Sequence, residues 1–264
     1  MDEQRQASET ALTKEASDAF QVHVQLPTGE TLSFQAKRSS NVRDLKMMVE
    51  VNSGVPSDLF TLVHRSDNNV SELNDETKMA DIDTPTAGDA SGGGSGGESM
   101  TFELSIPPWW QRFVDRCMKR DNRQIFKRIC IKMNQISNED RAFVAAFITA
   151  QKGDGELLEG LLNGDVKVDV EQTVQCSGRT LLHAAVAGGN FSCAAEIFMN
   201  GGSALLNKAD RQGCTPMDLA KHTNQQDLVE LLNKYVELQS QRSEERRVGK
   251  ECLRLCRSRW SPYH

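Results

Sequence analysis

The chain has 264 residues, of which 38% are hydrophobic and 26% charged, and its formal net charge is −6. This length allows about two domains, and no apolar run approaches the roughly 20 residues that cross a bilayer. The polar residues 1–19 carry no basic and apolar signal segments, which excludes a recognisable secretory signal. They predict a disordered N-terminus. Seven scattered cysteines indicate reduced thiols and an intracellular protein, in the cytoplasm or the nucleus.

The first structured segment has the pattern of a β-hairpin followed by a helix. Residues 20–36 alternate apolar and polar side chains on both sides of a turn, where Gly29 accepts positive φ. Apolar residues then recur at helical spacing from Val42 to Val49, and Gly54 ends the helix. The stretch DLFTLVH, from Asp58 to His64, adds a third strand. We therefore expect a small sheet covered by one helix.

This order of elements resembles ubiquitin. Residues 22–64 align with ubiquitin without a gap, through TGETLSF at the turn, VRDLKMMVE on the helix, SGVPSD after it and TLVH on the third strand. The stretch LNDETKMADID, at residues 73–83, is similar to the segment that carries ubiquitin's short fourth strand and 3₁₀ turn. The resemblance implies an α+β ubiquitin-like β-grasp domain.

A Gly/Ser-rich segment interrupts this domain. The stretch SGGGSGG at residues 91–97 cannot pack and predicts a flexible loop. Immediately after it, residues 100–106 alternate Phe102, Leu104 and Ile106, as the closing strand of the domain would. We therefore place the ubiquitin-like domain at residues 20–106, with residues 84–99 as a loop inserted into it.

The resemblance to ubiquitin also bears on partners. Ubiquitin is conjugated through a terminal diglycine, whereas here the chain continues past the last strand, which implies a built-in domain. Partners of ubiquitin contact an apolar patch, of which Val63 keeps one member, with Arg65 beside it, while Glu103 and Ser105 replace others. Val63 and Arg65 are therefore candidate partner-binding residues. The alternative is a scaffold domain that makes no such contacts.

Beyond residue 106 the periodicity becomes helical and repeats appear. Thr180 and Thr215 begin two units 35 residues apart, TLLHAA and TPMDLA, which resemble the start of an ankyrin repeat. One such unit cannot bury its apolar face alone, so neighbouring units are expected. Weaker matches upstream complete an all-α ankyrin-like solenoid over residues 107–241, with units at about 109–141, 142–176, 177–212 and 213–241.

The ankyrin resemblance assigns structural roles to five residues, namely Thr180, His183, Gly189, Thr215 and Pro216. It implies that Thr180 caps a helix while the His183 imidazole bonds to loop backbone. The alternative for His183 is metal binding or catalysis. His222, expected on a loop, has no Cys or carboxylate at ligand spacing. The sequence contains no Ser/His/Asp, Cys/His, HExxH, P-loop or GxGxxG pattern. We therefore expect no enzymatic activity, no cofactor and no metal.

A basic stretch precedes the clear repeats. Residues 112–132 contain eight Lys or Arg and two acidic residues, interleaved with apolar ones. Arg112, Arg116, Lys119 and Arg120 are candidate contacts for an anionic partner, whether acidic lipid, nucleic acid or an acidic protein groove. The alternative is the solvated face of two packed helices.

The last segment, residues 242–264, breaks from the rest of the chain. It has seven basic and three acidic residues, which leaves the preceding residues at −10. Its Cys252 and Cys256 form a single CxxxC, a weak signal for zinc. The segment resembles the conceptual translation of a sequencing adapter, so we expect a non-native tail and exclude it from the fold.

Together these patterns predict an interaction protein. The order of domains resembles the ankyrin-repeat and ubiquitin-domain-containing protein family. The resemblance implies a non-enzymatic adaptor for protein-protein interactions, with a link to ubiquitin-pathway components. We expect a monomer, and the acidic composition of the chain before residue 242 argues against nucleic-acid binding. Two alternatives remain open: the chain is the N-terminal targeting portion of a larger enzyme, or the basic stretch binds an anionic membrane or nucleic acid.

Overall fold

The computed structural model describes residues 19–66, 69–82, 99–119, 137–166, 168–238 and 240–241, together with positions 125 and 129. Residues 1–18 of the predicted N-terminal disorder, residues 84–98 of the predicted loop, Arg120 and the tail at 242–264 lie outside these residues, whereas Ala19 and Ser99 each begin a strand. The N-terminal part is a mixed sheet with the strand order β2-β1-β5-β3-β4. Its strands are β1 (Ala19–Gln25), β2 (Thr31–Lys37), β3 (Thr61–Ser66), β4 (Asn69–Glu72) and β5 (Ser99–Ser105).

The last strand of the sheet is also a central one. β1 and β2 form the antiparallel hairpin expected from the alternating pattern, with Val24 opposite Leu32. β5, which follows the Gly/Ser segment, pairs in parallel with β1 and antiparallel with β3. Met100, Phe102 and Leu104 of β5 are buried, so their alternation sets which face of the strand meets the core.

The fourth strand differs from expectation. We placed it within residues 73–83, but the strand that pairs with β3 is β4, Asn69–Glu72, with Arg65 opposite Val70. The expected segment instead contains the isolated bridge between Asn41 and Lys78 and the 3₁₀ helix η2 (Met79–Asp81). β4 has four residues and Val70 is 67% exposed, so it lacks the buried alternation by which a strand is recognised in sequence.

One helix covers the inner face of the sheet. α2 (Val42–Ser53) begins where the Asn41 N–H donates to the Asp44 carboxylate, and ends at Gly54, whose φ of 77° is left-handed. Val42, Leu45 and Val49 are buried, as their helical spacing predicts. A 3₁₀ turn, η1 (Ser57–Leu59), connects the helix to β3.

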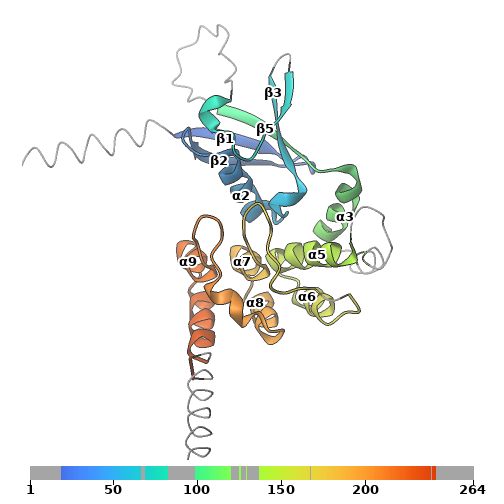
Figure 1. Ribbon diagram of the computed structural model, residues 1–264, viewed down its shortest axis with the longest axis vertical. Helices are drawn as coiled ribbons and strands as arrows, with labels where there is room; N and C mark the ends of the chain where they lie inside the picture. Colours follow the sequence, from blue (N-terminus) through green and yellow to red (C-terminus); the bar gives the residue numbers. More distant parts are fainter. Residues whose placement is uncertain are drawn as a thin grey trace, which may run out of the picture.

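The C-terminal part is a stack of short helices. They are α3 (Pro108–Met118), α5 (Asn138–Lys152), α6 (Gly155–Leu162), α7 (Leu181–Ala187), α8 (Phe191–Met199), η3 (Gly202–Asn207) and α9 (Pro216–His222), and residues 226–238 form a further helix. In Figure 1, α5, α7 and α9 stand in one row beneath the sheet, while α6 and α8 form a second row farther from it. Within the first expected unit, 109–141, the structure describes residues 109–119 and 137–141 and positions 125 and 129.

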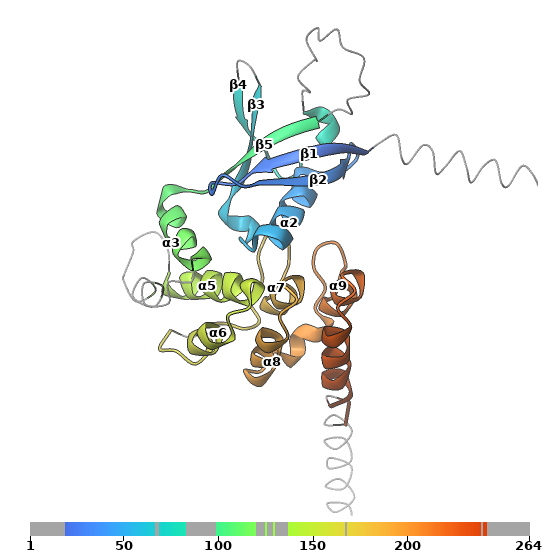
Figure 2. The same ribbon diagram turned by 180° about the vertical axis from the view of Figure 1, so that it is seen from behind.

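The sheet, α2 and the helical stack form successive layers. Figure 2 shows α2 between the sheet and the row of α5, α7 and α9. The buried apolar side chains of both parts form one continuous core, from Val22 in β1 to Leu232 in the last described helix. Within the described part of the chain, no helix is long and apolar enough to span a membrane.

Candidate interaction site between the sheet and the repeats

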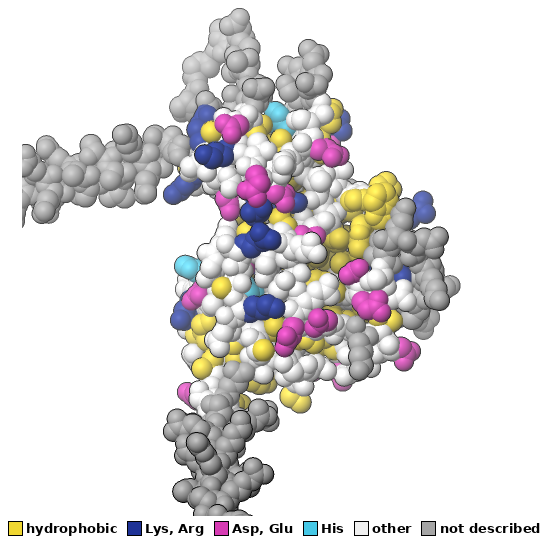
Figure 3. All heavy atoms as spheres, in the orientation of Figure 1, with side chains coloured by type: hydrophobic (Ala, Val, Ile, Leu, Met, Phe, Trp, Pro, Cys, Tyr) yellow, Lys and Arg dark blue, Asp and Glu magenta, His cyan; other side chains and the backbone are white. Residues whose placement is uncertain are grey.

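Two turns of the helical stack reach up to α2. The first lies before α7, where the Val174 N–H donates to the Arg179 carbonyl at 2.9 Å. The second lies before α9, where the Asp210 N–H donates to the Cys214 carbonyl at 2.9 Å. The Arg211 N–H joins the turns by donating to the Ser177 carbonyl at 2.9 Å. We call residues 174–179 and 210–214 the finger turns; Figure 3 shows acidic and basic side chains gathered where the sheet region meets the repeats.

Arg179 is the centre of this contact and is only 7% exposed. Its Nη1 donates to the Met47 carbonyl of α2 at 3.1 Å and lies 3.7 Å from Glu50 Oε1. Its Nε donates to Asp210 Oδ2 at 3.3 Å. One guanidinium therefore joins α2 to both finger turns, a use that suits its planar set of five donors.

Glu50 is the acidic partner on α2 and is 1% exposed. Its carboxylate accepts hydrogen bonds from the Ser57 N–H at 2.7 Å and the Ser177 hydroxyl at 3.0 Å. Burial raises the pKa of Glu50, although the hydrogen bonds from Ser57 and Ser177 and the charge of Arg179 oppose the rise. Hydrogen-bond donors thus surround most of the carboxylate in a buried environment that disfavours charge. Loss of any of these donors would therefore lower the stability of the fold.

A second polar cluster lies at the side of the same contact. The Asp58 carboxylate accepts hydrogen bonds from two consecutive N–H groups of the first finger turn, those of Gln175 and Cys176. The Cys176 thiol lies 3.3 Å from Asp75 Oδ2, and Lys46 Nζ donates to Asp75 Oδ1 at 3.0 Å. Burial would raise the pKa of Asp75, but the hydrogen bond and charge of Lys46 lower it. Burial raises the pKa of Cys176 to about 11.

Two glutamines extend the contact along α2. Gln151, in the last turn of α5, donates from Nε2 to the Val51 carbonyl at 3.1 Å. Gln212, in the second finger turn, donates from Nε2 to the Asp44 carboxylate at 3.2 Å. Polar bonds therefore follow α2 from its first turn to its last, and the sheet region and the repeats form a single packed unit.

Four of the residues assigned by the ankyrin resemblance, all except Gly189, lie directly after the finger turns. Thr180 caps α7, and its N–H donates to His183 Nδ1 at 3.2 Å. His183 Nε2 lies 3.1 Å from the Cys214 carbonyl of the next turn, which requires the proton on Nε2. Thr215 caps α9, with Pro216 at its first position. The imidazole thus ties one repeat to the next.

The loop between α7 and α8 contains a close approach that the sequence does not single out. Gly189 has a φ of 71°, a conformation that favours glycine. The tighter position is its neighbour Gly188, where a Cβ would collide with the Gln151 carbonyl of the preceding repeat. Asn190 fastens the same place by donating to the carbonyls of Ala150 and Gln151 at 2.8 and 2.7 Å.

Replacing Gly188 with alanine is expected to lower the free energy of unfolding by about 1–3 kcal/mol, because the repeats must move apart to admit a methyl group. Urea unfolding followed by circular dichroism measures the change. Gly155→Ala in α6 is the matched control, since the nearest atom to its added Cβ is Ser192 Oγ at 3.4 Å. Equal stability of the Gly188 and Gly155 variants would contradict the close approach.

The partner residues expected on the sheet lie on its outer face. Val63 is opposite Glu103 and is 8% exposed, so its side chain is largely covered. Arg65 pairs with Glu103 at 2.8 Å, and its side chain is 64% exposed. Ser105 pairs with Thr61 at the end of the same ladder. The structure thus leaves Arg65 as the accessible one of the two candidates.

Three of the four basic candidates are described, and all are exposed. Arg112 and Arg116 lie on α3 and Lys119 follows it, at spacings of four and three residues that place them on one face. Phe113, Val114 and Cys117 of the same helix are buried. The helix α3 lies beside α5, at the opposite end of the helical row from α9 (Figure 1).

Among the described residues, no group of three His, Cys, Asp or Glu side chains is arranged to hold a metal ion. The finger turns with their capped short helices define a class, that of helical-repeat proteins.

The comparisons specify the kind of repeat. A family model described as Ankyrin repeats (3 copies) matches residues 146–242, so this part of the chain consists of ankyrin repeats. The matched residues do not include the sheet region. Ankyrin-repeat domains are typically non-catalytic interaction modules. The comparison with curated proteins found no match for the chain.

Proposed function

We propose that the protein is a non-enzymatic adaptor whose sheet region and ankyrin repeats act as one unit in binding other proteins. The ankyrin repeats at residues 146–242 carry this proposal, because such arrays serve as protein-interaction modules. The polar contact around Arg179 supports the idea of a single unit, since a separate domain would not share buried charges with its neighbour.

The position of α2 bears on which surfaces are open. Repeat arrays commonly use an extended concave surface for partners. Here α2 rests on the finger turns and on α7, on the side that the first helices of the repeats form. We propose that the chain covers part of this surface itself, and that partners contact other faces of the unit.

The outer face of the sheet is the first such surface. It carries Arg65 and Glu103, and it is the face that the resemblance to ubiquitin relates to ubiquitin-pathway partners. The sheet order, with a parallel β5 between β1 and β3, is compatible with a β-grasp fold. These features support a link of the adaptor to the ubiquitin pathway, inside the cell.

Site-specific photo-cross-linking of the full chain tests this function. A p-benzoylphenylalanine at position 65 should capture discrete proteins in cells, among them ubiquitin-pathway components. Position 159, an exposed residue of α6, is the control. Discrete adducts without ubiquitin-pathway proteins would remove the pathway link. Adducts equal to those at position 159 would overturn the proposed surface.

The basic face of α3 favours a second candidate function, attachment to an anionic surface through Arg112, Arg116 and Lys119. Binding to vesicles that contain phosphatidylserine should then fall steeply as salt rises, because exposed charges are screened. Arg112→Glu should weaken binding, whereas Lys37→Glu, on exposed strand β2, should do so much less. Equal effects of the two substitutions would reject this candidate.

A further inference from the structure

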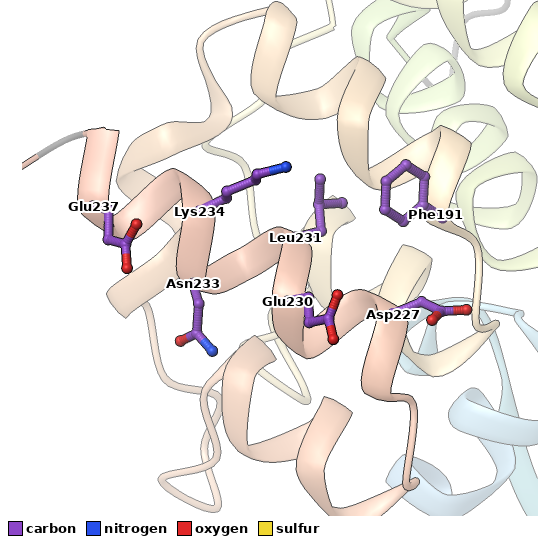
Figure 4. Close-up of a pocket in the computed structure, with 7 residues that line it drawn as sticks. All are labelled: Phe191, Asp227, Glu230, Leu231, Asn233, Lys234 and Glu237. Atoms are coloured by element: carbon purple, nitrogen blue, oxygen red, sulfur yellow. The ribbon is translucent and has the colours of Figure 1, made fainter.

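A groove lies at the far end of the helical stack, away from the sheet. It has a volume of about 520 Å³ and lies between the start of α8 and the helix at 226–238. Its lining residues are Phe191, Asp227, Glu230, Leu231, Lys234 and Glu237, with Asn233 beside them. In Figure 4, Phe191 faces the helix that carries all the others.

The floor of the groove is apolar and rigid. Phe191 is 50% exposed, although Ile197 and Phe198 of the same helix are buried. Leu231 beside it is 9% exposed. The two walls are held together by the stacked rings of Phe198 and Tyr235, whose centroids are 3.9 Å apart. An exposed aromatic ring on such fixed walls is a ready anchor point for an apolar side chain.

The rim of the groove is acidic. Asp227, Glu230 and Glu237 are exposed, against one lysine, Lys234. Figure 4 shows the carboxylates of Asp227 and Glu230 on one side of Leu231 and Lys234 on the other. No ion pair or hydrogen bond joins these three carboxylates to another described side chain. They extend over eleven residues of helix, about 15 Å, which matches four or five residues of extended peptide.

We infer that this groove binds a basic peptide segment of another protein, with an apolar side chain seated against Phe191 and Leu231 and Lys or Arg side chains beside Glu230 and Glu237. The charge of the rim selects a basic partner, and the acidic chain as a whole would steer it. A second copy of the chain is a poor occupant, because a twofold contact would place the same carboxylates opposite one another. The chain's own basic stretch at 112–132 is a poor occupant as well, because it starts on α3, at the other end of the row (Figure 1).

This inference rests on the proposed role in protein binding, and names one surface and its partner chemistry. Its failure is distinguishable from failure of that role, because cross-linking from position 65 does not involve the groove. Conversely, the groove can bind its peptide even if the sheet face has no partner.

Selection of a random twelve-residue display library against the full chain tests the inference. Enriched peptides should contain Lys or Arg around Phe, Leu or Trp. A synthetic copy of one of them should bind at least about tenfold more weakly to Glu230→Lys/Glu237→Lys, because two attractions become repulsions. Phe191→Ala should weaken the same peptide comparably through loss of its anchor.

Two matched variants separate the groove from general acidity and exposed apolar area. Glu159→Lys changes an exposed carboxylate of α6, and Met199→Ala removes a side chain that is 78% exposed outside the groove. Neither should change the affinity of the peptide. An equal loss with Glu159→Lys, enrichment of acidic peptides, or absence of any enriched peptide would overturn the inference. Self-association that Phe191→Ala abolishes would assign the groove to a second copy and overturn it too.

Discussion

Replacing Arg179 with methionine is expected to lower the free energy of unfolding by about 3–5 kcal/mol, the cost of leaving a buried charge without its partner. The side chains of Glu50 and Asp210, both 1% exposed, would lose the cation between them. Methionine keeps most of the length of the side chain, so the loss comes from charge and hydrogen bonds. Urea unfolding at neutral pH measures it. The transition should also lose cooperativity, because Arg179 joins the sheet region to the repeats.

A double substitution distinguishes this charge effect from lost packing. Glu50→Gln removes one of the two carboxylates, so Arg179→Met should cost less in that background than in the parent protein. Arg211→Met, at an exposed position of the neighbouring finger turn, serves as the control and should have little effect. If the Arg179 and Arg211 variants proved equally stable, Arg179 would not be the centre of the contact.

Acidification is expected to destabilise the protein through His183. Burial lowers its pKa to about 4, against 6.5 in the unfolded chain, while the hydrogen bond to Cys214 opposes the shift. The neutral imidazole therefore stabilises the fold fully above pH 6.5, and this stabilisation is lost as the pH falls toward 4. Between pH 7.5 and 5 the loss amounts to about 2 kcal/mol.

The measurement is the difference between the parent protein and His183→Gln across this pH range. Glu50 acts in the opposite sense, because burial raises its pKa and its contribution to stability falls as pH rises above its unfolded pKa. Subtracting the two curves removes that contribution. His183→Gln should be less stable at neutral pH but lose less on acidification, whereas His222→Gln, at an exposed position, should follow the parent curve. Parallel curves for His183→Gln and the parent would contradict the prediction.

The elements of this protein follow from local patterns in its sequence. α2 lies where the helical spacing from Val42 to Val49 predicts it and stops at Gly54. β5 is recognisable from its alternating Phe102 and Leu104, because alternation places one face in the core. β4 cannot be recognised in this way, because a short edge strand with an exposed Val70 buries too few side chains to give an alternating pattern.

The contact between the two parts follows from no local pattern. Glu50 looks like an ordinary surface residue of a short helix, and its partner Ser177 stands 127 residues away. The need for glycine at position 188 is likewise not predicted by a local pattern. Its neighbour Gly189 fits the repeat pattern, whereas Gly188 is required because the Gln151 carbonyl of the preceding repeat lies close to it.

The long interval between α2 and the finger turns has a consequence for synthesis. A ribosome adds about 5–20 residues per second, so roughly ten seconds separate the appearance of Glu50 from that of Ser177 and Arg179. During that time the sheet can close around β5 while the outer side of α2, with its carboxylate, faces water. The nascent protein therefore passes through a stage in which a surface destined for burial is accessible to chaperones. A product released before residue 179 would keep that surface exposed to solvent.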